Sequence, residues 1–473
     1  MSEGRGQWGS RLSFVLAAAG SAVGLGNMWK FPYITGMNGG GAFVLIYLVC
    51  ILLVGLPIMI GEVLLGRMSQ SSVVGTFPKL AGGPTPWAGV GWLGVATGVV
   101  ILSYYSVVAG WSMHYVYLAV SGGLSGVTEG IEGVDPAAIK ATFNAVAADP
   151  ALNVGWHAVF MALTALIVGA GVQQGVERAA RVMMPVLFLM MTALLVYATT
   201  LDGFGKAFDF VFGLHFERLT GAGVLEALGH SFFTLSVGMG AMLTYGSYLA
   251  KQDDLVSTSV AITLLDTAVA LMACLVLFPI TFTIGMEPAA GPGLVFQNMP
   301  VAFAELPGGA TWSVIFFVLL TFAALTSSIS LLEVPASYLI DERGWSRPKA
   351  VTVMVAAIFA LGVPSALSGG TALFGADFQA ATKPVLVAMG QEGGKSWFDT
   401  FDYLASNILL PVGGMGIALF AAWRIGDKAR RAEVAAGSTL GRIEGFYLVW
   451  LQLLRYLAPI AILVVMLHAL GLL

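Results

Sequence analysis

The chain has 473 residues, of which 58% are hydrophobic and 10% are charged, and its mean hydropathy is +0.86. Because soluble domains carry roughly 25% charged residues, this composition excludes an ordinary soluble protein and requires most of the chain to face lipid or other buried helices. The formal net charge of −4 does not indicate nucleic-acid binding, and the two cysteines, Cys50 and Cys274, lie in apolar runs that do not indicate a disulfide framework.

Apolar stretches of about 20 residues, separated by polar or Gly/Pro-rich turns, predict an all-α polytopic membrane protein with about eleven transmembrane helices. The N-terminal segment MSEGRGQWGSR lacks the order of a cleaved signal peptide, so we expect the first span to be retained. The spans are expected near residues 11–36, 41–66, 89–120, 155–172, 179–201, 223–250, 257–284, 312–341, 350–366, 397–424 and 443–470.

The Lys and Arg residues of the loops predict the orientation, because cytoplasmic loops carry an excess of both. Most of them fall on the cytoplasmic side if the N-terminus is cytoplasmic, and an odd number of spans then places the C-terminus outside. We therefore expect a multi-pass protein of the cell inner (plasma) membrane, with the basic segment 425–442 as a cytoplasmic connector. The long outside segments 121–154 and 367–396 are either solvated loops or parts of a gate.

The first predicted span is interrupted by the sequence GSAVGLGN at residues 20–27, which holds three glycines within eight residues. A transmembrane helix loses backbone hydrogen bonds at bilayer depth only where protein or a wet cavity satisfies those groups instead. Freed carbonyl groups can then bind a small cation, and freed N–H groups can face an anionic ligand. This segment therefore predicts a transporter with an ion and substrate site inside the membrane.

A second interruption lies in the sixth predicted span, where residues 230–245 read HSFFTLSVGMGAMLTY. Gly238 and Gly240 flank Met239 and follow the hydroxyls of Thr234 and Ser236. Single glycines commonly serve close helix packing, but two clustered breaks five spans apart favour an inverted repeat with a site between its halves. The predicted units are residues 1–201, with helices 1–5, residues 202–424, with helices 6–10, and residues 425–473, with the connector and helix 11.

Polar residues at bilayer depth predict a cation site. Asp266 lies near the middle of the seventh span, where an ionisable residue is expensive and marks a functional site. In the eighth span, FAALTSSISLLE supplies adjacent hydroxyls at Thr326 and Ser327. Hydroxyl and carbonyl oxygens are hard donors that can replace the hydration shell of sodium. The alternative is that these hydroxyls bond back to the preceding helical turn, which we expect for Ser328.

Other charged residues are expected to act between helices or at the ends of spans. Glu62 and Glu333 are assigned mainly structural roles, and Tyr105, which follows Tyr104, is by its pattern a packing residue. Two candidate ion pairs remain, one facing outward and one facing inward: Lys30 with Asp402, and Arg5 with Asp341.

Taken in order, these motifs resemble the bacterial branch of the neurotransmitter:sodium symporter family. The resemblance covers nearly the whole chain and is carried by GSAVGLGNMWKFPY, NGGGAF, GEVLLGR, SFFTLSVGMG, LTSSIS and GVERAARVMMP. It implies a leucine-transporter-like fold with a 5+5 inverted repeat, in which substrate is held between the broken helices 1 and 6.

The resemblance also implies two sodium ions and an L-amino acid substrate, with ligands at matching positions of this sequence. One sodium is expected to bind the substrate carboxylate together with Ala22, Asn27, Thr234 and Asp266. The other is expected to bind the carbonyls of Gly20, Val23 and Ala323 and the hydroxyls of Thr326 and Ser327. Substrate is expected to contact Ala22, Leu25, Gly26, Tyr105, Phe233, Thr234, Ser236, Met239, Ser327 and Leu331, with the Tyr105 hydroxyl at its carboxylate.

Some positions refine what the resemblance implies about the ligands. Monoamine carriers of the family have Asp where this chain has Gly24, so the glycine implies a ligand that brings its own carboxylate. Asp266 stands where many members have Asn, and Ala270 removes a chloride ligand. Asp266 can supply the fixed negative charge that chloride supplies elsewhere, so we expect chloride-independent transport, with a remaining pocket wall made of His230, Tyr47 and Thr234.

The gating elements are also expected from the resemblance. Lys30 replaces the more usual Arg of the outer gate and lacks its bidentate geometry, so its pairing with Asp402 should be weaker. Gly175 and Pro185 give a Gly-x9-Pro spacing at the cytoplasmic end of the fifth span, a pattern that goes with local unwinding in the family.

The predicted function is sodium-coupled import of hydrophobic L-amino acids, both aromatic and branched, by alternating access. Met239, which is unbranched and adaptable, and Leu331 favour the carriers of several hydrophobic amino acids. Alternatives are a proton-coupled or exchanging carrier of the same fold, or an amino-acid sensor that does not transport. An enzyme is not expected, because the five histidines are scattered without ligand spacing. The expected partners are the substrate and the lipid bilayer, without nucleic acid, for a monomer or weak dimer.

Overall fold

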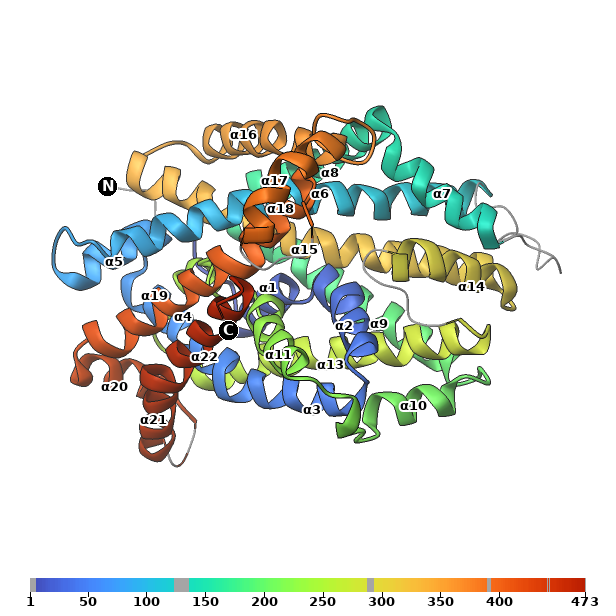
Figure 1. Ribbon diagram of the computed structural model, residues 1–473. Coiled ribbons are helices and arrows are strands. Elements are labelled where there is room, and N and C mark those ends of the chain that lie inside the picture. The colour runs from blue at the N-terminus through green and yellow to red at the C-terminus, as the bar shows by residue number, and fades with distance from the viewer. Residues whose placement is uncertain are drawn as a thin grey trace.

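The computed structural model describes residues 6–122, 136–286, 293–388, 393–439, 441 and 443–472, and within them it contains helices and no strands. Figure 1 shows the long helices running across the picture and packed side by side. In the described residues, nine helices are long and apolar enough to cross a membrane: Gly41–Ser69, Ala88–Ser121 (α6), Pro150–Gly169 (α8), Val172–Ala198, Leu255–Thr283 (α13), Gly309–Arg343 (α15), Arg347–Leu367 (α16), Trp397–Arg424 and Ile443–Ala469.

Two further spans are broken helices. The first consists of α1 (Arg11–Ala22) and the segment Gly26–Met37, which meet at a bend of 51°. The sixth is divided into α11 (Gly221–Thr234) and α12 (Ala241–Gly246), and neither half is long enough to cross a membrane. The prediction of about eleven spans with breaks in the first and the sixth is therefore confirmed.

Five π-helical turns in the described chain directly precede a helix that has proline as its second residue. Proline has no N–H, and its ring pushes away the carbonyl four residues earlier, so the preceding turn widens. The residue before the proline then bonds five residues back, as the Phe31 N–H does to the Gly26 carbonyl. The helices that begin in this way are α2 (Phe31–Met37), α4 (Leu56–Ser69), α14 (Met299–Glu305), α19 (Leu410–Leu419) and α22 (Ala458–Ala469).

The remaining helices complete the spans or lie in the loops. Those that complete spans are α3 (Gly41–Cys50), α9 (Arg178–Ala198), α18 (Trp397–Leu404) and α21 (Ile443–Gln452). The loops hold α5 (Val73–Ala81), α7 (Pro136–Ala148), α10 (Phe204–Phe212), α17 (Ala376–Ala388) and α20 (Asp427–Ala435), together with α14. None of these loop helices was predicted from the sequence.

The segment 294–305, which includes α14, is the most buried of these missed elements. Its side chains at Leu294, Phe296 and Met299 are 0–1% exposed, and the Phe296 carbonyl accepts a hydrogen bond of 2.8 Å from the Tyr115 hydroxyl. Twelve residues are too few to cross a bilayer, so a search for apolar stretches of about 20 residues passes over them.

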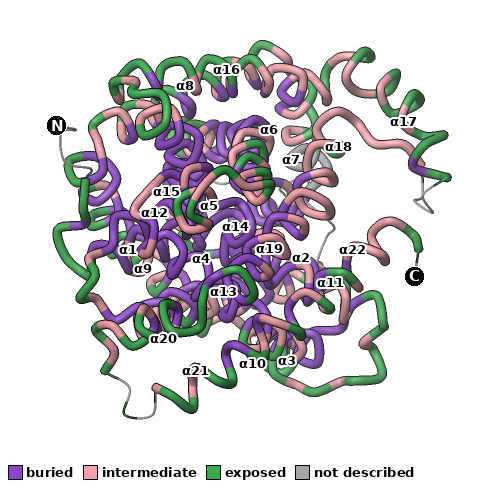
Figure 2. The backbone as a smooth tube through the Cα atoms, turned by 90° about the vertical axis from the view of Figure 1, so that its left-hand side faces the viewer, coloured by how far each residue is buried: buried purple, intermediate pink, exposed green. Residues whose placement is uncertain are grey.

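The centre of the bundle is where the two breaks lie. Figure 2, which views the molecule from the left-hand side of Figure 1, shows buried residues at the centre, around α1, α4, α6 and α15. Exposed residues form the rim, where α8, α16 and α17 lie. The helix α1 packs against α9, α13 and α15, and α12 packs against α4. The interrupted helices are therefore surrounded by protein rather than by lipid, as the loss of backbone hydrogen bonds requires.

The contact between α4 and α12 depends on a small residue. A Cβ atom at Gly66 would lie 2.0 Å from the Leu243 carbonyl oxygen, whereas a Cβ atom at Gly61, on the same helix, would lie 3.6 Å from the Leu454 side chain. The first distance is a clash with backbone and the second is ordinary van der Waals contact.

Gly66→Ala is therefore expected to destabilise the protein by about 1–3 kcal/mol, because α12 must move away from α4. Gly61→Ala is the matched control and should leave stability nearly unchanged. The measurement is the thermal unfolding midpoint of the purified protein in detergent. Equal midpoints for the two variants would contradict the close approach of α4 and α12.

Candidate functional site

The break in the first span begins where two backbone N–H groups leave the helical pattern. The Gly24 N–H donates to Asn27 Oδ1 at 3.0 Å, and the Leu25 N–H donates to the Tyr105 hydroxyl at 3.3 Å. In a continuous helix these two groups would bond to the carbonyls of Gly20 and Ser21. Those carbonyls are thereby freed for other partners at the centre of the bundle.

Two hydroxyl groups of the eighth span, α15, face the freed carbonyls. The Ser327 hydroxyl donates to the Ser21 carbonyl at 3.1 Å and lies 3.5 Å from the carbonyls of Gly20 and Val23. The Thr326 hydroxyl lies 3.5 Å from the Val23 carbonyl and donates to the Ala323 carbonyl at 3.0 Å. The structure thus brings together the five residues expected at one sodium site, Gly20, Val23, Ala323, Thr326 and Ser327. This neutral set of hard oxygens suits sodium.

The break in the sixth span is built from residues with positive φ. Ser236, Gly238 and Gly240 have φ values of 52°, 91° and 77°. A Cβ atom at Gly238 would lie 2.4 Å from the Leu410 carbonyl oxygen, so position 238 requires glycine for space as well as for conformation. Ser236 is not a glycine, and its hydroxyl donates to the Ser21 carbonyl at 2.8 Å. This hydrogen bond joins the two breaks directly.

A buried carboxylate supports the second break. Glu62, in α4, is 0% exposed and accepts hydrogen bonds from the Gly238 N–H at 2.5 Å and the Leu243 N–H at 3.3 Å. These are N–H groups that the interruption of the helix leaves without helical partners. The structural role assigned to Glu62 from the sequence therefore consists of satisfying the backbone of the sixth span.

A second cluster of oxygen atoms joins the first, sixth and seventh spans. Asn27, Thr234 and Asp266 are at most 1% exposed. Asn27 Nδ2 donates to Asp266 Oδ1 at 2.7 Å and to Thr234 Oγ1 at 3.1 Å, and the Thr234 hydroxyl donates to Asp266 Oδ2 at 3.0 Å. Within the described residues Asp266 has no basic side chain within 4.0 Å. A buried carboxylate without a basic partner fits a mobile cation.

Tyr47 and His230 pack together near this cluster, beside Phe31. Their ring centroids are 5.7 Å apart, and both rings pack against Phe31. Among the described atoms, the Tyr47 hydroxyl and both ring nitrogens of His230 have no hydrogen-bond partner. Ala270 is fully buried and presents only a methyl group.

A cavity of about 30 Å³ lies between the two breaks. It is lined by all ten residues that were expected to contact substrate: Ala22, Leu25, Gly26, Tyr105, Phe233, Thr234, Ser236, Met239, Ser327 and Leu331. Ser21, Gly24 and Ile101 line it as well and were not among them. Ile101 precedes Tyr105 by four residues, which places both on one face of α6, so helical spacing alone was a signal for it.

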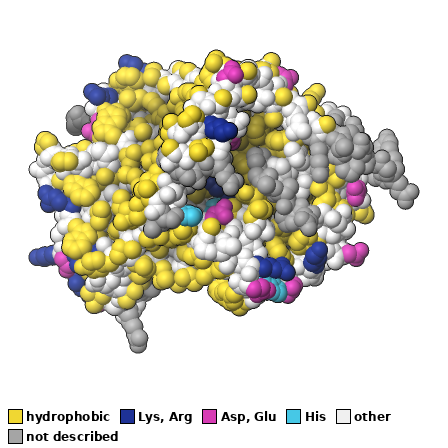
Figure 3. Space-filling model, in the orientation of Figure 1, with side chains coloured by type: hydrophobic (Ala, Val, Ile, Leu, Met, Phe, Trp, Pro, Cys, Tyr) yellow, Lys and Arg dark blue, Asp and Glu magenta, His cyan; other side chains and the backbone are white. Residues whose placement is uncertain are grey.

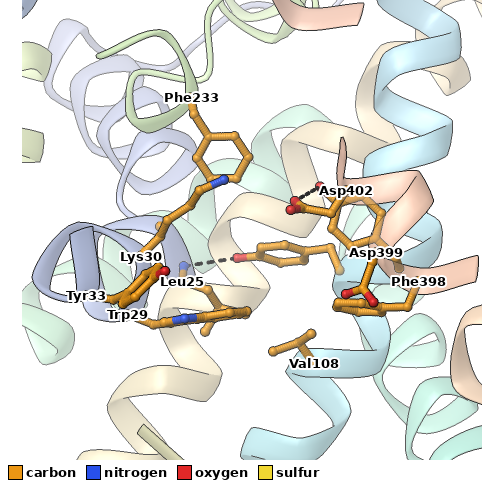
Figure 4. A pocket seen from close by; sticks show the side chains of 12 residues that line it. Leu25, Trp29, Lys30, Tyr33, Val108, Phe233, Phe398, Asp399 and Asp402 are labelled. Atoms are coloured by element: carbon orange, nitrogen blue, oxygen red, sulfur yellow. Dashed lines mark hydrogen bonds between the residues drawn. The ribbon is translucent and has the colours of Figure 1, made fainter. Parts of the chain in front are cut away.

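A larger cavity of about 230 Å³ adjoins the first one, and Figure 4 shows its lining. Leu25, Gly26, Tyr105 and Phe233 line both cavities and so separate them. The Phe233 ring lies at one edge of the larger cavity, with the Lys30 side chain extended toward it (Figure 4). A ligand that moves from the larger cavity to the smaller one must therefore pass Phe233 and Tyr105.

The expected outer ion pair is not formed in this structure. Lys30 Nζ lies 4.5 Å from the centroid of the Phe233 ring, whereas Asp402 accepts a hydrogen bond of 3.0 Å from the Tyr104 hydroxyl. Both residues line the larger cavity, but no Lys30–Asp402 contact of 4.0 Å or less occurs. Lys30 and Asp402 can form a gate only if the larger cavity closes. This gate stays a prediction.

At the opposite end of the first span, packed aromatic residues close the bundle. Trp8 Nε1 donates to the Tyr245 carbonyl at 2.9 Å, and the Trp8 ring packs edge-on against Tyr245 and Tyr248. The Tyr248 hydroxyl donates to Glu333 at 2.7 Å, and Glu333 forms an ion pair of 2.7 Å with Arg347. Trp8 was not predicted from the sequence, although a tryptophan in the polar segment QWGS was a signal.

The other expected gating residues lie at this same end. Asp341 is in the last part of α15, and its expected partner Arg5 lies outside the described residues. Gly175 is in the π-helical turn Val172–Glu177 that opens the fifth span, and a Cβ atom there would lie 1.9 Å from the Ile167 carbonyl oxygen. Pro185 is inside α9.

Comparison with known proteins gives matches along nearly the whole chain. The model of the sodium:neurotransmitter symporter family matches residues 5–131 and 148–471. YhdH, an uncharacterized sodium-dependent transporter of Bacillus subtilis, is 38% identical over 467 residues, which are 99% of this chain and 98% of YhdH. An uncharacterized sodium-dependent transporter of Methanocaldococcus jannaschii is 30% identical over 91% of this chain and 84% of its own length. The crystal structure of MhsT in complex with L-phenylalanine covers 98% of this chain and 100% of MhsT, with a TM-score of 0.85 and 41% identity.

The carboxylate of Glu62 gives a test of how the site is held together. Glu62→Gln leaves one acceptor oxygen and places an amide N–H₂ against a backbone N–H, so the break in the sixth span loses support. Leaving one such buried donor unsatisfied is expected to lower stability by about 1–3 kcal/mol. The thermal midpoint and the binding of a labelled ligand should both decrease, whereas the exposed Glu305→Gln should change neither. A Glu62→Gln variant as stable as its parent would contradict this role.

Proposed function

The chain belongs to the sodium:neurotransmitter symporter family and is a sodium-dependent membrane transporter, and we propose that it imports hydrophobic L-amino acids together with sodium ions. It has the leucine-transporter-like fold of MhsT, and members of the family are transporters rather than enzymes. The observation that carries the proposal is the small cavity between the two helix breaks, which adjoins both clusters of oxygen atoms.

Gly24 supports an amino acid as the substrate class. A Cβ atom at this position would lie 2.5 Å from the Ser327 Oγ and 3.1 Å from the Tyr105 hydroxyl oxygen, so a side chain with a carboxylate does not fit here without displacing both. The substrate must then bring the carboxylate itself. The Tyr105 hydroxyl and the backbone of the first break are the groups that would receive it.

The apolar end of the cavity supports a hydrophobic side chain on the substrate. Ile101, Phe233, Met239 and Leu331 line it, and MhsT, which is 41% identical to this chain, has L-phenylalanine bound in its structure. The cavity leaves only about 30 Å³ of free space, so we expect Phe233 and Met239 to move when a large side chain binds. Methionine adapts readily because it is unbranched, which favours several substrates of different size.

Two sodium ions are proposed because the two oxygen clusters are separate and chemically different. The cluster of Asn27, Thr234 and Asp266 carries a negative charge and adjoins the place proposed for the substrate carboxylate, with Ala22 completing the ligands. The cluster around Thr326 and Ser327 is neutral. A substrate carboxylate that completes the first shell makes the affinities for ion and substrate depend on each other.

Alternating access would use the two ends of the first and sixth spans. The Ser236–Ser21 hydrogen bond joins the two breaks, so we expect the broken helices to move together. We propose that Lys30 and Asp402 close the outer side, that Arg5 and Asp341 close the inner side, and that Gly175 and Pro185 allow the fifth span to open. Because the cell interior is negative, each sodium ion that enters gains about 2.3 kcal/mol per 100 mV, which can drive accumulation.

The proposed repeat units remain residues 1–201 and 202–424, followed by residues 425–473, with the N-terminus cytoplasmic and the C-terminus outside.

Asp266 also supports chloride-independent transport, because it supplies a fixed negative charge beside the proposed cation while Ala270 offers no polar ligand. A proton-coupled or exchanging carrier is the second candidate and would use the same cavity without the hydroxyl cluster as an ion site.

Uptake by purified protein in proteoliposomes tests the proposed function. With an imposed inward sodium gradient, labelled tryptophan, tyrosine, phenylalanine and leucine should accumulate, whereas glycine and glutamate should not. Accumulation without sodium would favour the proton-coupled or exchanging carrier. Sodium-dependent binding without any accumulation would identify a sensor instead.

Chloride dependence tests the role of Asp266. Uptake by the parent protein should not change when chloride is replaced by gluconate at constant sodium. Asp266→Asn removes the fixed charge, so its uptake should decrease at least about tenfold, the effect of roughly 1.4 kcal/mol, and part of it should return when chloride is added. Asp209→Asn, whose side chain is 79% exposed in α10, is the control and should behave as the parent. Loss of parental uptake on removal of chloride would overturn the assignment.

A further inference from the structure

One arginine in the eleventh span has no counter-charge among the described residues. Arg455 lies in the π-helical turn Leu453–Leu457, where its Nε donates to the Ala422 carbonyl at 3.2 Å. Within the described residues its two Nη groups have no hydrogen-bond partner and no carboxylate lies within 4.0 Å. By contrast, the buried Arg430 bonds to the Tyr447 hydroxyl, to Asp427 and to three carbonyls. An ionisable group in a span without such partners indicates a ligand.

The position of this guanidinium places it near the membrane surface. Ala422, to which it bonds, lies two residues before Arg424, the last residue of the tenth span. At 1.5 Å per residue, the contact lies roughly 3 Å inside the end of that span. Arg424 is exposed, and its Nη2 donates to the Ala81 carbonyl at 3.1 Å. Two guanidinium groups therefore border the same helix end.

Two exposed aromatic rings complete this niche. Trp423 is 55% exposed and Tyr456 is 50% exposed, and their ring centroids are 5.7 Å apart in an edge-on arrangement. The guanidinium carbon of Arg455 lies 5.0 Å from the Trp423 ring centroid. Amphipathic rings on lipid-facing helices gather at the level of the lipid headgroups. Arg424, Arg455, Trp423 and Tyr456 are referred to below as the basic–aromatic niche.

Neighbouring carboxylates do not neutralise the niche. Asp427 pairs with Arg430 at 3.0 Å and with Arg431 at 3.3 Å, and Glu444 also pairs with Arg431. In Figure 3, Lys and Arg side chains lie along the left-hand end of the molecule beside a largely apolar surface, at the end where Figure 1 places α5, α20 and α21. The loops at this end carry the excess of basic residues, so the niche faces the cytoplasmic leaflet in the proposed orientation.

We propose that the basic–aromatic niche binds the phosphate of an anionic phospholipid of the leaflet at this end. The guanidinium groups offer donors in a planar fork that matches phosphate oxygens, and their charge favours an anionic headgroup over a zwitterionic one. The rings of Trp423 and Tyr456 pack against the glycerol region. A lipid held there would bridge the tenth and eleventh spans, since Arg424 belongs to one and Arg455 to the other.

The test uses the full-length protein, purified in detergent and stripped of lipid, with retained lipid counted by native mass spectrometry. Phosphatidylglycerol and phosphatidylcholine with the same acyl chains are titrated separately. The parent should retain one phosphatidylglycerol at concentrations where it retains no phosphatidylcholine. The double variant Arg424→Gln/Arg455→Gln should bind phosphatidylglycerol at least about tenfold more weakly, as expected when roughly 1.4 kcal/mol is lost.

The matched control is Arg178→Gln, an exposed arginine at the start of α9, which should bind as the parent does. If the double variant elutes as aggregate, Arg455→Lys replaces it, since Lys keeps the charge but loses the fork and should weaken retention. Equal retention by parent and variant, or equal retention of the two lipids, would overturn the proposal. Displacement of the lipid by millimolar inorganic phosphate would identify a site for free phosphate instead.

Discussion

Everything at the centre of this protein depends on the need to satisfy backbone hydrogen bonds away from water. Breaking two helices at mid-bilayer frees N–H and C=O groups, and each unsatisfied group would be expensive in lipid. The structure meets that need with side chains from other spans: Glu62 accepts from the backbone of the sixth span, and Tyr105 accepts from that of the first. The breaks therefore exist only because the second and third spans are packed against them, which makes the site and the core of the bundle one unit.

The two oxygen clusters differ in charge, and this difference separates their chemistry. Asp266 is a buried carboxylate whose nearest described partners, Asn27 and Thr234, are neutral, so its charge remains for a mobile cation to balance. The cluster of Thr326 and Ser327 consists of hydroxyls and carbonyls and carries no formal charge. Hydrogen bonds from Ser236 to the Ser21 carbonyl and from Asn27 to Thr234 connect the two broken helices, so a change at one break reaches the other.

The two ends of the bundle are in different states in this structure. At one end Trp8 is packed against Tyr245 and Tyr248 and is 8% exposed. At the other end a cavity of about 230 Å³ separates Lys30 from Asp402. Phe233 is common to this cavity and to the smaller one beneath it, and it carries the Lys30 ammonium on its ring. Motion of Phe233 would therefore couple the position of the Lys30 ammonium to access to the smaller cavity.

The amino-acid sequence by itself determined the membrane class, the eleven spans and the two breaks, whereas ten of the residues that line the smaller cavity were expected from the family resemblance. The spans and the breaks follow from local rules, because span length and glycine clusters are properties of short segments. Only the tertiary structure decided that Glu62 supports the sixth span, that Ser21 lines the smaller cavity, that Trp8 packs against Tyr245 and Tyr248, and that Lys30 lies on Phe233 rather than on Asp402. Those contacts join residues from different spans, and the pattern of a segment does not contain the position of its neighbours. The short segment 294–305 was missed because twelve residues are too few to cross a bilayer, and only the structure shows that it packs against α13 and α15.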